Sequence, residues 1–369
     1  WEGTTIGVAS DEQGYYLISS PKIYPSTIMV SFVGYQKHSL IIKEWGNYPI
    51  LLSPSVELEE VMVKGKVNTT KYSTINSINM QTLSTGELEK AACCNLSESF
   101  STNATVDVTF TDAVSGAKKI QMLGLDGVYT QITQENMPLI RGISSAYGLS
   151  YVPGTWIESI QIIKGAGSVI NGFESFAGQI NLEYYKPETA SKLFWNAYTN
   201  SEGKIENNLL LAKKQGYWKS NLFTHISYFD KEVDNNEDNF LDIPKVKQVN
   251  VLNRWTYSAN KNYYIEFTAR GLVEDRIGGT LENSAKPYEV NIHNGLLEVT
   301  TKTGAILPNS PGKSMGLQTS FRKHNQTAIF GKNKYEGLQE SAYFNLIRQT
   351  YIVNTDHKLK YGISNYADR

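Results

Sequence analysis

The sequence lacks several features that would point to a familiar class of protein. It has 2 cysteines among 369 residues, which excludes a disulfide-rich scaffold and a multi-cysteine zinc or iron–sulfur protein. No apolar run of about 18 residues occurs, so no segment is a candidate transmembrane helix. Lys and Arg total 35 and Asp and Glu total 36, and without a basic excess no nucleic-acid partner is expected.

The sequence also lacks the local signatures of a catalytic centre. Its 5 histidines stand far apart, in different predicted elements, which argues against a zinc site. We find neither the Gly-x-Ser-x-Gly pattern of a serine hydrolase nor a convincing pair of carboxylates. The sequence therefore predicts a protein that is not an enzyme.

Short alternating segments at the start of the chain favour β-structure. Tyrosine accounts for 23 residues, and aromatic residues are enriched in strands. Within residues 1–54, strands are predicted at Gly14–Ile18, Thr27–Val33, Ser39–Lys43 and Tyr48–Leu52. Short strands at near-regular spacing are typical of a small β-sandwich. Because the chain starts at Trp1 inside an apparent strand, we expect it to be a segment of a longer protein.

The middle of the chain, residues 79–187, mixes helix and strand signals. Ser84 and Glu87 have the spacing of a helix capping box, and the helix would continue through Ala91 and Ala92. A further short helix and several strands are predicted at Leu96–Phe100, Val106–Val108, Lys119–Leu123, Ile157–Ile163 and Gln179–Glu183. This part of the chain is therefore expected to be an α+β domain.

From residue 188 onward, the pattern changes to long strands. Between residues 263 and 274, apolar side chains such as Phe267 alternate with polar ones such as Glu266. Residues 218–228 repeat the alternation and carry an aromatic residue at each end. A membrane-spanning strand needs about 9–11 residues, an apolar lipid face and aromatic ends, all of which are present. The alternative is a soluble sandwich that buries the apolar face.

Residues 156–182 resemble the end of the plug domain of TonB-dependent outer-membrane receptors. Trp156–Gly165 is followed by Gly167-Ser168, Asn171-Gly172 and Ala177–Leu182, in register with the Ile-Glu, Lys-Gly and Gly-x-Ile-Asn elements of the family pattern. Ala91–Phe100 resembles the early plug helix of a subgroup that carries adjacent cysteines.

The start of the chain resembles the carboxypeptidase-regulatory-like sandwich that precedes some of these receptors. The similar residues are Gly3–Thr5, Asp11–Tyr16 and Val33–Tyr35. The resemblance divides the chain into a β-sandwich (1–63), an α+β plug (64–187) and the first strands of an antiparallel transmembrane β-barrel (188–369). The expected fold is mostly β. Family barrels have about 22 strands, and roughly eight strands of spanning length are found here, so the expected barrel is incomplete.

Two places depart from the family pattern. An Arg-Gly usually follows the early plug helices, and the matching place holds Leu123-Gly124. The family's Asp-Gly-Val-Pro segment appears as Glu135–Pro138.

The resemblance implies active uptake across the outer membrane of a Gram-negative bacterium. A plug would fill the lipid-embedded barrel, and a scarce substrate would bind on the extracellular side. That substrate would be a metal chelate such as a siderophore, haem or a corrinoid. TonB would couple an inner-membrane complex to the plug from the periplasmic side. A ligand shifts an equilibrium only by its differential affinity, so a tight site has to be forced open.

Residues 141–153 are rich in Gly, Ser and Tyr and are expected to form an apical loop of the plug. Arg141, Tyr147 and Tyr151 are candidate substrate contacts, because Arg and aromatic side chains concentrate binding energy. The alternative is packing of this loop against the barrel wall.

Residues 234–242 form an acidic loop between two predicted strands. Asp234, Asn236, Asp238 and Asp242 occupy the first, third, fifth and ninth positions of a calcium loop. Lys245 replaces the bidentate Glu of an EF-hand, which excludes that motif. Calcium in a looser loop is the one cofactor that the sequence suggests, and a solvated acidic turn is the alternative.

Cys93 and Cys94 are adjacent. They are candidates for a vicinal disulfide, for a soft-metal contact or for a pair of small buried residues. An oxidising periplasm permits the disulfide.

Two other functions remain open. One is import of a glycan or peptide by the same family, although the Asn-Ala stretch before Asp-Pro-Leu that is usual in glycan importers is absent here. The other is a surface binding protein that does not transport and is built from soluble β-sandwiches.

Overall fold

The computed structural model describes most of the chain. The described ranges are 1–11, 13–19, 23–32, 35, 37–52, 70–73, 80–88, 95–100, 103–260, 262–307, 312–352 and 357–369. The chain divides into two compact units, Trp1–Val67 and Asn68–Arg369. The predicted domain boundary between residues 63 and 64 lies outside the described ranges.

The described part of the first unit contains one antiparallel pair of strands, β1 (Ser26–Val30) and β2 (His38–Ile42). Ile28 and Ile42 are directed inward and are buried. These two strands confirm the predictions at 27–33 and 39–43.

The predicted strands Gly14–Ile18 and Tyr48–Leu52 are wrong, because neither segment is a strand. Leu17 is 81% exposed and Leu51 is 90% exposed. An alternating segment becomes a strand only where another strand satisfies its backbone groups, and neither segment has such a neighbour in the described part. The described residues of this unit form one two-stranded sheet, and the β-sandwich stays a prediction.

The second unit begins with the plug segment, the part that precedes residue 188. Its main sheet has the strand order β3-β4-β10-β11-β8-β9, and β5, β6 and β7 form a smaller sheet. The bounds are β3 Thr70–Ser73, β4 Met80–Ser84, β5 Val106–Asp112, β6 Ala117–Met122, β7 Leu125–Asp126, β8 Thr130–Gln134, β9 Met137–Pro138, β10 Ile157–Lys164 and β11 Gly178–Tyr184.

Helical structure in the plug segment is short. The elements are α1 Thr85–Leu88 and the 3-10 turns η2 Glu98–Phe100, η3 Gly127–Tyr129, η4 Gly142–Ser145, η5 Gly154–Trp156 and η6 Val169–Asn171. The predicted capping-box helix starts where expected, and the positions of Ala91 and Ala92 lie outside the described residues. The second predicted helix is a single 3-10 turn.

Apolar side chains on β10 and β11 form the core of the plug segment. Ile160, Ile162, Ile180 and Leu182 are completely buried. The two strands pair antiparallel, and β11 also pairs in parallel with β8. The four predicted strands of this segment are confirmed.

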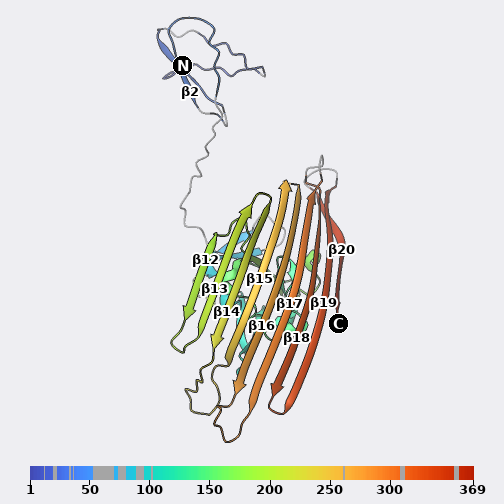
Figure 1. Cartoon of the computed structure of the whole chain (residues 1–369). Helices are drawn as coiled ribbons and strands as arrows, with labels where there is room; N and C mark the ends of the chain where they lie inside the picture. The colour runs from blue at the N-terminus through green and yellow to red at the C-terminus, as the bar shows by residue number, and fades with distance from the viewer. Residues whose placement is uncertain are drawn as a thin grey trace. The chain divides into compact units, whose positions relative to one another are not determined.

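The rest of the second unit is one nine-stranded antiparallel sheet, called the wall below, in which every strand pairs with its sequence neighbours (Figure 1). The bounds are β12 Leu193–Thr199, β13 Ile205–Gln215, β14 Trp218–Phe229, β15 Lys245–Asn260, β16 Tyr263–Gly279, β17 Glu289–Ile306, β18 Ser314–Phe330, β19 Asn333–Tyr351 and β20 Lys358–Asp368. The edge strands β12 and β20 each pair with a single strand, so the sheet does not close.

The two faces of the wall are inverted relative to a soluble sandwich. On β16, Ile265 is 47% exposed and Phe267 is 39% exposed, whereas Glu266 and Arg270 are buried. On β14 Asn221, His225 and Ser227 share the buried face with Phe223 and Phe229, whereas Trp218, Ile226 and Tyr228 on the other face are exposed. A water-soluble sheet buries its apolar face, whereas a transmembrane barrel turns that face to lipid and encloses a polar lumen. The soluble-sandwich alternative is therefore wrong.

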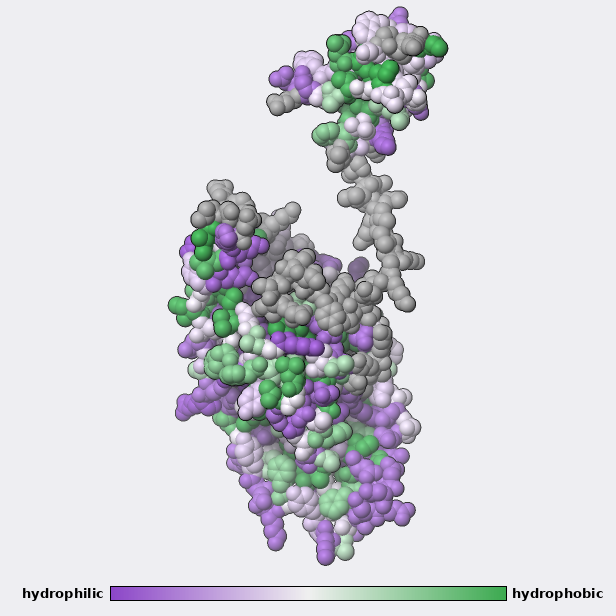
Figure 2. Space-filling model, turned by 180° about the vertical axis from the view of Figure 1, so that it is seen from behind, coloured by the Kyte–Doolittle hydropathy of each residue, from purple (hydrophilic) through white to green (hydrophobic). Residues whose placement is uncertain are grey.

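The two ends of the wall differ in their connections. At the end here called the loop end, residues 230–244 join β14 to β15 and residues 280–288 join β16 to β17. At the opposite turn end, the connections include the tight turn at 216–217. In Figure 2, which shows the side away from the viewer of Figure 1, hydrophilic side chains gather toward the loop end. Among the described residues, no helix is long and apolar enough to span a membrane.

Candidate functional site

The plug segment lies against the polar face of the wall, and wall side chains hold its main chain. Asn250 donates an amide hydrogen bond to the carbonyl of Tyr151 at 2.7 Å, and Asn221 donates one to the carbonyl of Tyr185 at 2.8 Å. Arg276 reaches the carbonyl of Ser115 at 2.9 Å. Because these contacts use carbonyl oxygens, they hold the plug segment with little dependence on its side chains.

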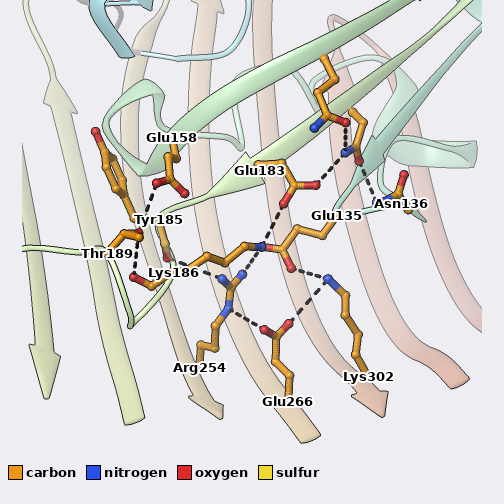
Figure 3. Close-up of polar contacts among 12 residues, drawn as sticks. Glu135, Asn136, Glu158, Glu183, Tyr185, Lys186, Thr189, Arg254, Glu266 and Lys302 are labelled. Atoms are coloured by element: carbon orange, nitrogen blue, oxygen red, sulfur yellow. Dashed lines mark hydrogen bonds and ion pairs between the residues drawn. The ribbon is translucent and has the colours of Figure 1, made fainter. Parts of the chain in front are cut away.

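Glu135 is the buried carboxylate at the centre of this interface (Figure 3). It sits in the β8–β9 turn, where Glu135 and Asn136 have φ values of 51° and 65°. Its backbone N–H donates to the carbonyl of Leu182 at 2.8 Å, which ties the turn to β11. The left-handed turn thereby directs the carboxylate toward the wall.

Three cations surround the Glu135 carboxylate. Arg254 on β15 lies 2.5 Å from it and Lys186 lies 2.7 Å from it, and Lys302 on β17 also pairs with it. Glu266 on β16 completes the cluster at 3.8 Å from Arg254 and 3.6 Å from Lys302. Figure 3 shows that the wall and the chain segment leading into the wall both direct charges at this one group.

The surrounding charges keep Glu135 ionised. Burial opposes ionisation, but the charges of Arg254, Lys302 and Lys186 outweigh it and hold the pKa of Glu135 well below its usual range. Burial likewise disfavours charge on Lys186, but the Glu135 carboxylate raises the pKa of that amine. The plug segment and the wall are therefore joined by full charges at neutral pH.

Other wall charges have partners within the wall itself. Arg322 pairs with Glu298 at 2.5 Å and also donates to the carbonyl of Leu139. Arg276 pairs with Glu274 at 3.1 Å. Both partners of each pair lie on the wall, so the pairs would persist if the plug segment were displaced. Arg254 would likewise keep Glu266 as a partner.

An aromatic contact supports the polar one. Trp156 of the plug segment is buried between Tyr184 and Phe223 on β14, with ring centroids 6.1 Å and 5.4 Å away. Burial raises the pKa of Tyr184 to about 12. The plug segment and the wall thus share one apolar core as well as one ionic cluster.

A cavity of about 310 Å³ opens between the plug segment and the wall at the loop end. We call it the outer cavity. It is lined by the β5–β6 hairpin, by the segment after η4 and by wall residues such as Phe229, Glu274 and Arg276. Its volume is near the lower limit of ordinary small-molecule sites. The cavity places plug and wall side chains within reach of one ligand.

The three predicted substrate contacts do not lie together. Tyr147 lines the outer cavity, and the Arg276 guanidinium lies 5.2 Å from its ring centre. Burial raises the pKa of Tyr147, so its hydroxyl is neutral. Tyr151 is buried against the wall, where its ring lies edge-on to His324. Substrate contact by Tyr147 stays a prediction.

Arg141 also lies in a contact between the plug segment and the wall. It pairs with Glu174 at 2.8 Å, and its guanidinium lies 3.7 Å from the ring centre of Tyr366 on β20. Arg141 and Tyr151 thus both contact the wall, and substrate contact by either residue stays a prediction. The sequence could not distinguish substrate contact from packing against the wall, because both kinds of site favour Arg and Tyr.

The acidic loop uses its carboxylates to hold its own turn. Asp234 accepts backbone hydrogen bonds from Asp238 and Asn239, and Asp242 accepts one from Asn235. Asn236 lies in the same turn and contacts the Asp238 carboxylate at 3.0 Å. No group of three or more His, Cys, Asp or Glu in the described ranges is arranged to hold a metal ion. Calcium binding here stays a prediction, and Cys93 and Cys94 lie outside the described residues.

Sequence reasoning did not identify the Glu135 cluster. One signal was available, since Glu135–Pro138 departs from the family's Asp-Gly-Val-Pro segment. A second was the polar face of residues 263–274, which places Glu266 inside the wall. The pairing joins strands far apart in sequence, so no local pattern predicts it.

Comparison with known sequences decides the nature of the plug segment. Residues 73–179 match the family described as TonB-dependent Receptor Plug Domain. The chain carries a TonB-dependent receptor plug. Proteins with this plug are outer-membrane receptors of Gram-negative bacteria and are not enzymes, which confirms both expectations. A search of curated proteins found no match.

Solved structures show the same arrangement of plug and barrel strands. FpvA from P. aeruginosa, bound to heterologous pyoverdines, has a TM-score of 0.66 at 11% identity and covers 80% of this chain and 43% of its own. The alcaligin outer-membrane receptor FauA from Bordetella pertussis has a TM-score of 0.61 at 9% identity, and the match covers 80% of this chain and 49% of FauA. The siderophore receptor PiuA from Acinetobacter baumannii has a TM-score of 0.59 at 12% identity, and the match covers 79% of this chain and 45% of PiuA.

The chain therefore spans less than half the length of these solved structures. Identities this low show the fold alone. The expected fold of a plug followed by strands of an antiparallel outer-membrane barrel is confirmed, and the preceding carboxypeptidase-regulatory-like domain stays a prediction.

Proposed function

We propose that the full-length protein takes up a small, scarce substrate across the outer membrane, driven by TonB. The substrate would be a metal chelate such as a siderophore, haem or a corrinoid. The structural relatives support this class, since PiuA is described as a siderophore receptor and FauA as an alcaligin receptor.

The shared lining of the outer cavity is the observation that carries the proposal. Plug residue Tyr147 and wall residue Arg276 both face it, so a ligand there contacts the plug directly. In outer-membrane barrels the longer loops are extracellular and the turns periplasmic, which supports an extracellular position for the loop end.

The Glu135 cluster supports the need for an energy source. Separating a buried carboxylate from its cations exposes charges that burial makes costly to leave unpaired. A small ligand in the outer cavity makes no contact with this cluster, so its binding energy cannot displace the plug there. Force applied from the turn end by TonB would supply what the ligand does not.

Growth of a deletion strain on single nutrient sources tests the proposal. The strain would receive iron as one chelate at a time, haem or cobalamin, and complementation by the full-length gene would restore growth. We expect one source to fail without the protein. Normal growth on all of them would contradict the proposal and favour the glycan or peptide alternative.

A variant of the outer cavity then locates the site. Phe110, which lines the cavity and is 65% exposed, can be replaced without disturbing the core. We expect Phe110→Ala to raise the chelate concentration for half-maximal growth by about tenfold, the loss of one good contact. Phe173→Ala, at an 80% exposed plug position outside the cavity, is the matched control and should behave as wild type.

A further inference from the structure

A second and larger cavity lies between the plug and the wall at the turn end. Its volume is about 730 Å³, within the range of ordinary ligand sites. We call it the inner chamber. Plug strands β10 and β11 and the η6 turn form one side, and wall strands β16 to β20 form the other. The Glu135 turn borders it, because Asn136 is part of its lining.

The hollow on the wall side is made by two glycines. Gly304 on β17 and Gly316 on β18 are directly paired across the strands, and both line the chamber. A Cβ atom at Gly304 would meet nothing within 4 Å, and one at Gly316 would meet only a carbonyl oxygen at 3.7 Å. Neither residue has a positive φ, so neither the backbone nor close packing requires glycine there.

Glycine inside a strand weakens the strand and often marks a place where a ligand approaches closely. The cross-strand pair Gly304–Gly316 therefore keeps a space open that ordinary side chains would fill.

The plug side presents unused hydrogen-bonding capacity to the same space. Gln179 on β11 lines the chamber and is 1% exposed, and neither its amide nitrogen nor its amide oxygen has a partner among the described residues. Leaving a buried amide unpaired is unfavourable, so natural interiors rarely retain one. Gln179 is poised to bond a molecule held in the chamber.

Amides surround Gln179 on the plug. Asn171 donates to the side chain of Asn136 at 3.2 Å, and Asn181 donates to that of Gln161 at 3.1 Å. Asn181 is fully engaged, because its amide oxygen accepts from Thr133 and from the backbone of Asn136 and its amide nitrogen also donates to Glu183. Asn136 and Gln161 each use their amide oxygen in these bonds, and each also carries an amide nitrogen. The chamber thus offers donors and acceptors of one uncharged kind.

Charge distinguishes the two cavities. Among the described residues that line the inner chamber, the single charged side chain is the exposed Lys360. The outer cavity, in contrast, is lined by Lys204, Glu274 and Arg276 among others. A cation that enters the inner chamber would lose hydration without meeting a countercharge, and an anion would meet only the exposed Lys360, whereas a neutral polar molecule would exchange water for amide hydrogen bonds.

We propose that the inner chamber is a second ligand site, separate from the outer cavity, for an uncharged molecule rich in hydrogen-bonding groups such as amides or hydroxyls. In uptake, the chamber would hold the substrate after it leaves the outer cavity and before it reaches the periplasm. This role of the chamber rests on the proposed uptake function. Its selectivity follows from Gln179 and the glycine pair alone.

Thiol labelling tests this selectivity without knowledge of the substrate. The full-length protein would carry Cys93→Ser and Cys94→Ser together with Gln179→Cys, in isolated outer membranes open on both sides. The probes are neutral methyl methanethiosulfonate and its anionic sulfonatoethyl and cationic trimethylammonium-ethyl analogues. Gln215→Cys, at the exposed end of β13, is the matched control and corrects for intrinsic reactivity.

We divide the modification rate of Gln179→Cys by that of Gln215→Cys for each probe. We expect this ratio to be at least about tenfold higher for the neutral probe than for either charged probe, because entering the chamber costs a charged probe its hydration. Adding Gly316→Phe should abolish modification by the neutral probe, and adding Gly316→Ala should not. Equal rates for all three probes, no modification by any probe, or no effect of Gly316→Phe would each overturn the proposal. Ser168→Cys, a second lining position, replaces Gln179→Cys if that variant does not fold.

The same variants separate this inference from the uptake function. If the deletion strain shows a growth defect, Gly316→Phe should keep chelate binding on whole cells and lose growth, while Gly316→Ala keeps both. Full growth of the Gly316→Phe strain would overturn the chamber's role in passage. A deletion strain with no defect would remove the uptake function, and the labelling result would still decide the site.

Discussion

Glu135 of the plug and Arg254 of the wall lie 2.5 Å apart, although 119 residues separate them in the chain. The carboxylate ends a left-handed turn and the guanidinium projects from the middle of a wall strand. Arg254 and Lys302 keep Glu266 as a partner if the plug leaves, and Glu135 keeps Lys186. The contact therefore joins the plug and the wall while leaving each side with a countercharge.

Removing the Glu135 charge should loosen the plug. Glu135→Gln keeps the shape but leaves Arg254 and Lys302 with one carboxylate between them. Breaking a buried pair costs about 3–5 kcal/mol, and we expect a loss toward the lower limit because Glu266 remains. Hydrogen exchange in detergent should become faster for β8 and β11 and stay unchanged for β16 and β17. Glu188→Gln, at a half-exposed pair with Lys219, is the control and should have almost no effect.

Acid should loosen the same contact only at low pH. The folded-state pKa of Glu135 is depressed, so its stabilising contribution is complete above the ordinary carboxyl pKa and is lost as the pH falls through the folded value. We expect plug exchange rates to be flat from pH 7 to about pH 5 and to rise only well below the usual carboxyl range. A rise that begins between pH 7 and pH 6 would contradict the assignment to Glu135. In Glu135→Gln, the rise of the plug exchange rates at low pH should disappear.

The aromatic contact between plug and wall should be measurable as a coupling energy. Trp156→Ala removes a fully buried ring and should destabilise the protein by about 3–5 kcal/mol. Phe223→Ala on the wall should cost a similar amount. In a double-mutant cycle from urea unfolding, Trp156 and Phe223 should couple by about 0.5–1.5 kcal/mol. Additive effects would mean that the two rings do not pack together.

Calcium binding by residues 234–242 has a direct test. If the loop binds Ca²⁺, titration calorimetry of the full-length protein should give heat that is lost in Asp238→Ala, because oxygen ligands hold this ion. Asn235→Ala, which leaves all four predicted ligands in place, is the control. Identical heats for the parent and Asp238→Ala would remove the calcium prediction.

The strands and their faces could be predicted from the sequence because they depend on local alternation. In β16, the period of two separates Phe267 from Glu266 whatever the strand pairs with. The motif at Trp156–Gly165 likewise identified the end of the plug, and β10 forms there. The same reasoning failed at Gly14–Ile18, because alternation cannot supply a partner strand.

Side-chain partners across the interface could not be predicted in this way. Tyr147, Tyr151 and Arg141 look alike in sequence, yet Tyr147 lines a cavity and the other two pack against the wall. Which of them faces open space depends on wall strands that lie far away in the sequence. Residue type alone does not carry that information.

The sequence by itself determined that the chain is a plug followed by long strands with one apolar and one polar face. Only the tertiary structure decided that Glu135 meets Arg254 and that Gly304 and Gly316 lie opposite each other. Strand faces follow from the geometry of a single backbone, which the order of residues sets directly. Ion pairs and cavities follow from the register between distant strands, which is set when the whole sheet forms.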